Sequence, residues 1–166
     1  MPTSTLVPQH DLSLFDGCGE MGQLCREFPW ELSPIGAPVT WPASLRIVVR
    51  TVLESQFPMC VLCGSDLVQI YNDAFRTVLG SKHPQALGKA SANSWREIWT
   101  DVAPLLASAQ SGEASVLRSG ARFVIERDVG APEETFFALV PSPVRDEDGR
   151  VVAVLGVAME TTSKVL

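Results

Sequence analysis

The sequence of 166 residues is poor in the side chains that carry most enzyme and metal chemistry. It contains only two histidines, four cysteines and one tyrosine. Cys60 and Cys63 form a CxxC motif, but the sequence has no second CxxC and no histidine pair to complete a zinc site with it. The sequence also contains no phosphate loop, metal triad or nucleophile-base pairing. Four cysteines in a chain of this length do not make a disulfide scaffold, which favours a reducing compartment. We therefore expect a cytoplasmic protein that is not an enzyme.

Positive charge is also scarce, and no cluster of lysine and arginine stands out. The formal net charge is −6, so the chain lacks the electrostatic footprint expected for nucleic acid or for an anionic membrane surface. The longest apolar run, Val151–Met159, is far shorter than the roughly 20 residues that span a bilayer. The N-terminus has no basic region and is not a secretory signal. We expect no nucleic-acid partner and no membrane insertion.

The most strongly patterned stretch runs from Pro141 to Thr162. It predicts the end of one strand, a tight turn at Asp148-Gly149 and a long apolar strand from Val151. A strand that is apolar throughout is buried on both faces, so something must pack on each side of it. The rest of the chain is expected to supply those two layers.

Before residue 59 the sequence predicts a loose tail over residues 1–16 and a helical extension over 17–58. A short helix is indicated by apolar residues at helical spacing from Met21 to Phe28. A second helix follows Thr40, a candidate N-cap, with Pro42 in its first turn. Its apolar stripe comprises Leu45, Val48, Val49, Val52 and Leu53.

Residues 59–162 predict a hairpin, a helical middle and a three-stranded meander. The hairpin strands are Met59–Cys63 and Leu67–Tyr71, and Asn72 is the expected N-cap of the next helix. Ser94 and Glu97 have capping-box spacing and predict the start of a longer helix. The predicted class is α+β, with one five-stranded antiparallel sheet. The helical middle is expected to cover one face of this sheet. The N-terminal helices are left to cover the other face or to dimerise.

Three segments of the chain have a recognisable pattern: PMCVLCGSDLVQIYNDAFRTVLGSKHPQALGK, SWREIW and SPVRDEDGRVVAVLGVAMETT. Together they resemble the PAS sensor family, of the type that precedes bacterial sensor histidine kinases. The upstream segment GEMGQLCREFPWELSPIGAPVTWPASLRIVVRTVLES resembles the helical extension found before such cores, so the resemblance covers about residues 19–164. It implies a PAS core over 59–162, the start of an exit (signalling) helix at 163–166 and a downstream kinase module in the parent chain.

The resemblance raises haem and flavin as cofactors, and the residues argue against both. Oxygen-sensing relatives use a histidine on the helix that here reads SWREIWTDVAPLL, although ligation by a cysteine or by His83 stays open. Flavin-binding light sensors carry a motif of the type Asn-Cys-Arg-Phe-Leu-Gln, which NSWREIW lacks. On a strand, Cys60 and Cys63 point to opposite faces and cannot share a metal. We predict no cofactor and no metal.

The remaining candidates form a pocket between the helical middle and the sheet. The predicted lining is Tyr71, Phe75, Trp95, Ile98, Trp99, Val102, Phe123, Phe137, Leu139 and Val157. The aromatic rings either line a cavity or fill it as ordinary core. The Tyr71 hydroxyl either meets a ligand or bonds a backbone carbonyl. Strand alternation places Phe137 and Leu139 on one face.

Two hypotheses follow from these features. In the first, the chain is a sensory module that binds a small, mainly apolar ligand, such as a fatty-acid-like metabolite, and regulates a downstream histidine kinase. In the second, it is a ligand-free module for dimerisation or protein interaction. We expect a homodimer formed through the N-terminal helices, and Val49→Asp distinguishes a dimer seam from a stripe that packs on the sheet.

Overall fold

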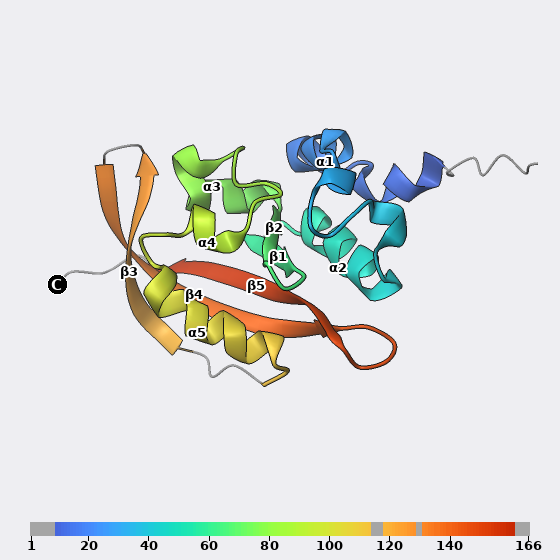
Figure 1. The fold of residues 1–166 in the computed structure, drawn as a ribbon. Helices are drawn as coiled ribbons and strands as arrows, with labels where there is room; N and C mark the ends of the chain where they lie inside the picture. The colour runs from blue at the N-terminus through green and yellow to red at the C-terminus, as the bar shows by residue number, and fades with distance from the viewer. Residues whose placement is uncertain (1–8, 114–117, 129–130, 162–166) are drawn as a thin grey trace, which may run out of the picture.

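A computed structural model describes residues 9–113, 118–128 and 131–161 (Figure 1). The strands are β1 (Met59–Cys63), β2 (Val68–Tyr71), β3 (Arg118–Asp128), β4 (Ala131–Arg145) and β5 (Val151–Thr161). The α-helices are α1 (Gly19–Glu27), α2 (Ala43–Glu54), α3 (Arg76–Leu79), α4 (Ser91–Ser94) and α5 (Trp99–Gln110). The 3-10 turns are η1 (Gln9–Phe15), η2 (Trp30–Leu32), η3 (Pro38–Thr40), η4 (Asp73–Phe75) and η5 (Gly80–Lys82).

The strands form one antiparallel sheet in the order β2-β1-β5-β4-β3. The hairpin of β1 and β2 therefore joins the C-terminal meander through β5, the long apolar strand, which pairs with β1 on one side and β4 on the other. The predicted α+β class with an antiparallel sheet is confirmed.

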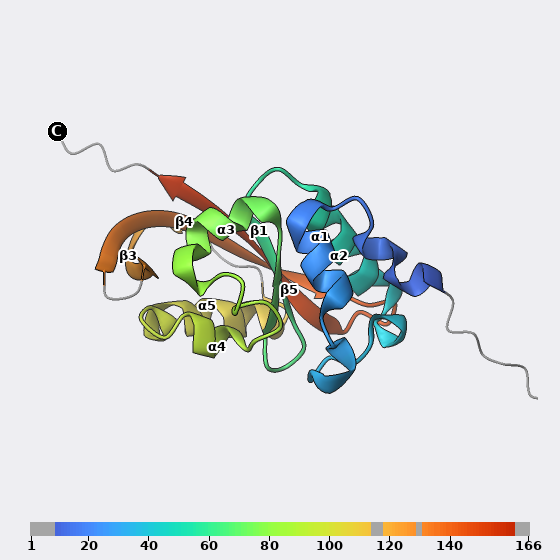
Figure 2. The same ribbon diagram turned by 90° about the horizontal axis from the view of Figure 1, so that it is seen from above.

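The sheet is covered on both faces, as a strand that is apolar throughout requires. The α1–α2 pair lies on one side of β1 and β5, while α3, α4 and α5 lie on the other side (Figure 2). The stripe of α2 is buried within the chain, with Val49 and Val52 fully inaccessible to solvent. The N-terminal helices thus cover the second face of the sheet, which is one of the two roles expected for them.

Three aromatic side chains build the core of the N-terminal extension. The Trp41 ring packs edge-on against Phe15 and Trp30, with centroids 6.3 and 5.4 Å away. The Trp30 indole N–H donates to the carbonyl of Cys25 at 2.7 Å. Phe15 belongs to the stretch expected to be a loose tail, yet it ends η1 and is 2% exposed. The tail therefore ends earlier than residue 16, because Phe15 has a partner to pack on.

Two helix starts differ from the prediction. Thr40 does not cap α2; its hydroxyl donates to the carbonyl of Ala37, the residue before η3, and α2 begins at Ala43 after Pro42. Ser94 ends α4 instead of starting a long helix. Tertiary packing overrides the capping pattern here, because the chain leaves helical geometry at Trp95, whose side chain turns toward the sheet. The Asn72 cap is confirmed, since its side chain accepts from the backbone N–H of Phe75.

Candidate functional site

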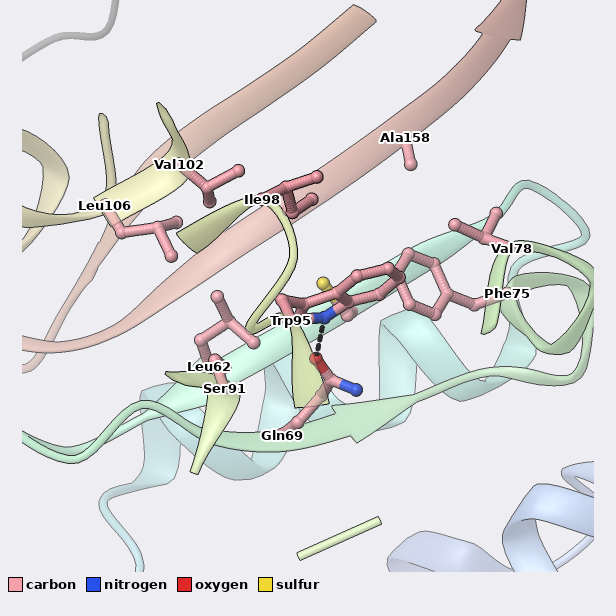
Figure 3. A pocket seen from close by; sticks show the side chains of 12 residues that line it. Leu62, Gln69, Phe75, Val78, Ser91, Trp95, Ile98, Val102, Leu106 and Ala158 are labelled. Atoms are coloured by element: carbon pink, nitrogen blue, oxygen red, sulfur yellow. Dashed lines mark hydrogen bonds between the residues drawn. The ribbon is translucent and has the colours of Figure 1, made fainter. Parts of the chain in front are cut away.

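An apolar cavity of about 60 Å³ lies between the sheet and the helical middle (Figure 3). Strands β1, β2 and β5 form its floor, and side chains from η4, α3, α4, α5 and the link between α4 and α5 close it. The lining residues are Cys60, Leu62, Gln69, Phe75, Val78, Ser91, Trp95, Ile98, Val102, Leu106, Gly156 and Ala158. None of these described residues is charged, so the cavity suits apolar matter.

Small residues on the neighbouring strands β1 and β5 create the space. Cys60 on β1 pairs with Gly156 on β5, and Ala158 follows Gly156 on the same face of the sheet. The opposite wall is bulky, because the rings of Phe75 and Trp95 meet nearly perpendicularly with centroids 6.3 Å apart. Short side chains under large rings leave a gap that neither wall fills.

The main polar feature of the cavity is the side chain of Gln69, which is fully buried. The Trp95 indole N–H donates to Gln69 Oε1 at 2.8 Å, the bond drawn in Figure 3. An indole N–H can only donate, so this bond fixes which end of the amide faces Trp95. The amide nitrogen, Nε2, is left buried without a hydrogen-bond partner among the described residues.

Two further polar groups at the cavity are inert. The Ser91 hydroxyl, also fully buried, donates to the carbonyl of Leu67 at 2.7 Å. Burial raises the pKa of the Cys60 thiol to about 12, so it stays protonated at neutral pH and is a poor nucleophile. Among the described lining residues, none forms an acid-base pair or an activated nucleophile.

Four of the predicted pocket residues meet at this cavity. Phe75, Trp95, Ile98 and Val102 all line it, contributed by η4, by the link between α4 and α5, and by α5. Sequence spacing alone could not decide whether these side chains line a cavity or fill the core. The structure gives them both roles, because they are buried and still border the gap.

Three predicted residues lie elsewhere. Val157 pairs with Met59 and alternates to the face opposite Gly156 and Ala158. Trp99, at the start of α5, is half-buried beside the core. Tyr71 is buried and does not line the cavity, and its hydroxyl lies 2.8 Å from Nδ1 of His83. Burial raises the pKa of the Tyr71 phenol.

The side chains of Phe123, Phe137 and Leu139 lie outside the described part of the structure. Their backbones belong to β3 and β4, where Phe137 pairs with Ala121 and Leu139 pairs with Arg118. Their role in the pocket stays a prediction.

None of the residues that form the floor of the cavity was predicted from the sequence. The residues not foreseen are Cys60, Leu62, Gln69, Val78, Ser91, Leu106, Gly156 and Ala158. Two signals were available: a glutamine inside the otherwise apolar strand LVQIY, and a glycine and an alanine two positions apart in β5. The predicted divergence of Cys60 and Cys63 is seen, because residues three apart on β1 face opposite sides.

A family model for the PAS fold matches residues 53–166. The chain belongs to the PAS family. The predicted PAS sensor domain is thereby confirmed, and its matched part contains every residue that lines the cavity. No curated protein matches the chain.

Solved structures similar to this PAS chain include several light-oxygen-voltage (LOV) proteins. The LOV protein of Rhodobacter sphaeroides is 17% identical, with a TM-score of 0.55 over 73% of this chain and 69% of its own. An RNA-binding LOV receptor is 22% identical, with a TM-score of 0.51 over 76% of this chain and 36% of its own. A LOV domain studied with a flavin analogue is 19% identical, with a TM-score of 0.50 over 72% of this chain and 86% of its own. At these identities the likeness shows the shared fold.

One expectation is corrected by these structures. The missing light-sensor motif argues against flavin, and the sequence predicts no cofactor. That inference is wrong, because LOV proteins, one of them studied with a flavin analogue, share this fold at low sequence identity. A short motif is therefore not a sufficient ground for excluding flavin.

Among the described helices, none has the length and apolar character needed to cross a bilayer.

Proposed function

We propose that this PAS domain is a sensory module whose cavity binds a small, mainly apolar ligand. The observation that carries the proposal is the gap between β5 and α5, lined almost wholly by apolar side chains. A metabolite with a hydrocarbon or ring body, fatty-acid-like or similar, gains from leaving water there. A charged body would be buried without a partner and pay a large desolvation cost.

The size of the cavity suggests how occupancy becomes a signal. About 60 Å³ is far below the roughly 300–1,000 Å³ of typical ligand pockets. A ligand of metabolite size therefore requires α4 and α5 to move away from the sheet. Because the open arrangement binds the ligand better than the closed one, binding shifts the population toward the open state.

The route of the signal follows β5. Gly156 and Ala158 touch the cavity, and the same strand runs on to Thr161, near the C-terminal end of the sequence. A change of packing on β5 is thereby passed toward the segment that follows the core. We propose a histidine kinase as the module that receives it, as the resemblance of the sequence implies.

A flavin is a second candidate occupant of the same site. Its isoalloxazine ring is flat, uncharged and edged with carbonyl acceptors, which suits the apolar walls and the unpaired amide nitrogen of Gln69. A bound flavin would supply absorption of blue light. Gln69 and the rings of Trp95 and Phe75 are the residues that would hold it, once the cavity has widened.

The test is a comparison of native and denaturing mass spectra of freshly purified protein, with an absorbance spectrum of the same sample. We expect a reproducible excess mass in the native spectrum that is lost on denaturation. Absorbance in the visible range would assign it to flavin or haem, and its absence to a metabolite. A bare chain mass in both spectra, repeated after incubation with cell extract, would refute the proposal.

A homodimer through the N-terminal helices remains our proposal for assembly. The stripe containing Val49 is buried in the chain and not available to a partner, so Val49→Asp would disrupt folding. Ile47 on the outer side of α2 is 65% exposed, and Leu32 is also exposed. Ile47→Asp should therefore weaken a dimer while leaving the fold intact, as measured by light scattering. An unchanged mass for this variant would rule out α2 as the seam.

A further inference from the structure

We propose that Gln69 is the recognition group of the cavity, and that it selects ligands carrying a neutral hydrogen-bond acceptor. The acceptor would be a carbonyl oxygen or an unprotonated ring nitrogen on an otherwise apolar body. The inference rests on the proposed function and narrows its ligand class. It favours such molecules over plain hydrocarbons and over carboxylates that place their charge in the cavity.

Gln69 is held rigidly by contacts at both ends. Its backbone N–H donates to the carbonyl of Lys89, and its carbonyl accepts from the N–H of Gly88, both at 2.9 Å. Oε1 is taken by the Trp95 indole. The unpaired Nε2 is therefore fixed in place, and rotating the amide would only exchange one unpaired group for another.

Burying an unpaired amide N–H in an apolar site costs free energy, and a ligand that bonds to this N–H removes the cost. Most buried polar groups in proteins are paired, so an exception with defined orientation calls for an explanation. A ligand acceptor that reaches Nε2 gains a hydrogen bond without displacing any partner of that group. A hydrocarbon of the same shape gains burial alone and leaves the amide unsatisfied.

The surroundings favour a neutral acceptor over an anion. None of the described lining residues is cationic. Lys82 lies over the Trp95 ring, 5.8 Å from its centroid, but is paired with Glu97 at 3.2 Å. A carboxylate inside the cavity would have one amide for stabilisation and no counter-charge, which does not offset its desolvation.

The indole N–H of Trp95 can report ligand binding at Gln69, and the indole N–H groups of Trp30 and Trp41 serve as controls. A ligand bonded to Nε2 polarises the Gln69 amide and alters the hydrogen bond from Trp95, so the Trp95 indole resonance should shift. Trp30 and Trp41 donate to the carbonyls of Cys25 and Gly36 in the N-terminal extension. Their indole resonances should not move.

The experiment titrates ¹⁵N-labelled protein with three probes of similar size: acetophenone, ethylbenzene and benzoate. Wild-type protein should bind acetophenone about tenfold more tightly than ethylbenzene, the effect of one well-made hydrogen bond. Benzoate should bind more weakly than acetophenone. Gln69→Leu should remove the preference for acetophenone while ethylbenzene still binds, and Gln69→Met repeats the test if the leucine variant does not fold.

The outcomes separate the two proposals. Binding of acetophenone and ethylbenzene with equal affinity, a preference that survives in Gln69→Leu, or tighter binding of benzoate would overturn the role of Gln69 and leave the ligand-binding function standing. No binding of any probe to folded wild-type protein would count against the cavity as a ligand site, and the role of Gln69 would fall with it.

Discussion

The carboxylate of Asp73 accepts a hydrogen bond from the backbone N–H of Met21 at 2.8 Å, across 52 positions of sequence. The acceptor belongs to η4 in the sensory core, and the donor belongs to the first turn of α1 in the N-terminal extension. Gly19 makes the approach feasible, because a Cβ at that position would lie 2.1 Å from Asp73 Oδ2. The extension is thus attached to the core through the start of α1.

Removing this link should lower the stability of the whole domain. Asp73→Ala leaves a helix N-terminus uncapped, and we expect a loss of about 1 kcal/mol in the free energy of unfolding by urea. Asp73→Asn keeps an oxygen acceptor and should lose less. Asp66→Ala, in the exposed turn after β1, is the control. Asp73→Ala as stable as this control would mean that the cap does not hold the extension.

Asn72 is a second junction, and a more heavily bonded one. Its buried Nδ2 donates to the carbonyls of Val52, Ser55 and Phe57, while Oδ1 accepts from the N–H groups of Met59 and Phe75. Asn72→Ala should cost about 3 kcal/mol or more, because several buried groups lose their partner together. Asn93→Ala, which alters an exposed asparagine, should change urea unfolding little. Equal stability of the two variants would contradict this account.

The bond between Gln69 and Trp95 can be measured through its coupling energy. Gln69→Leu leaves the indole N–H unpaired, and Trp95→Phe leaves the amide oxygen unpaired, so each should cost about 1–3 kcal/mol. The double variant removes both groups and should cost less than the sum of the single variants by about 1 kcal/mol. Strict additivity in chemical unfolding would show that the bond contributes nothing to stability.

Alkaline pH should destabilise the fold through its buried thiols. Burial raises the pKa of Cys60 to about 12, whereas an unfolded thiol ionises near 8.5. Stability from the protonated thiol is complete below the unfolded pKa and declines between about pH 8.5 and 12, because only the unfolded state releases the proton.

The size of this effect can be isolated with one variant. Between pH 8 and pH 10 the Cys60 thiol should account for about 2 kcal/mol of lost stability. Cys60→Ala should lower stability at pH 8 but show a smaller decline toward pH 10 in urea unfolding. The exposed change Ser65→Ala should leave the pH dependence as in the wild type. An identical decline in Cys60→Ala would contradict protonated burial of this thiol.

The parts of the fold that sequence could predict are those determined locally. The hairpin from Met59 to Tyr71, the Asn72 cap and the turn at Asp148-Gly149 depend on residues close together in the chain. The break before α5 was not predictable in this way. It depends on a bond from Trp95 to Gln69, 26 positions away, which outweighs the capping pattern at Ser94.

The cavity shows the same limit. Large apolar residues suggest a core, and four of the predicted residues line the cavity. The space itself depends on small residues. Gly156 lies opposite Cys60 and Ala158 lies two positions further along β5, and this register appears only when β5 pairs with β1. The unpaired amide of Gln69 likewise could not be predicted from the sequence. Its burial and its hydrogen-bond partners depend on residues that lie far from it in the chain.

The most direct test of the central claim fills the cavity and asks whether the ligand is lost. Val102→Phe enlarges a lining residue of α5, and Ile47→Phe makes the equivalent change at an exposed position of α2. Native mass spectra should show a bound small molecule on wild type and on Ile47→Phe, and a bare chain for a folded Val102→Phe. A ligand retained by Val102→Phe at wild-type occupancy would contradict binding in this cavity.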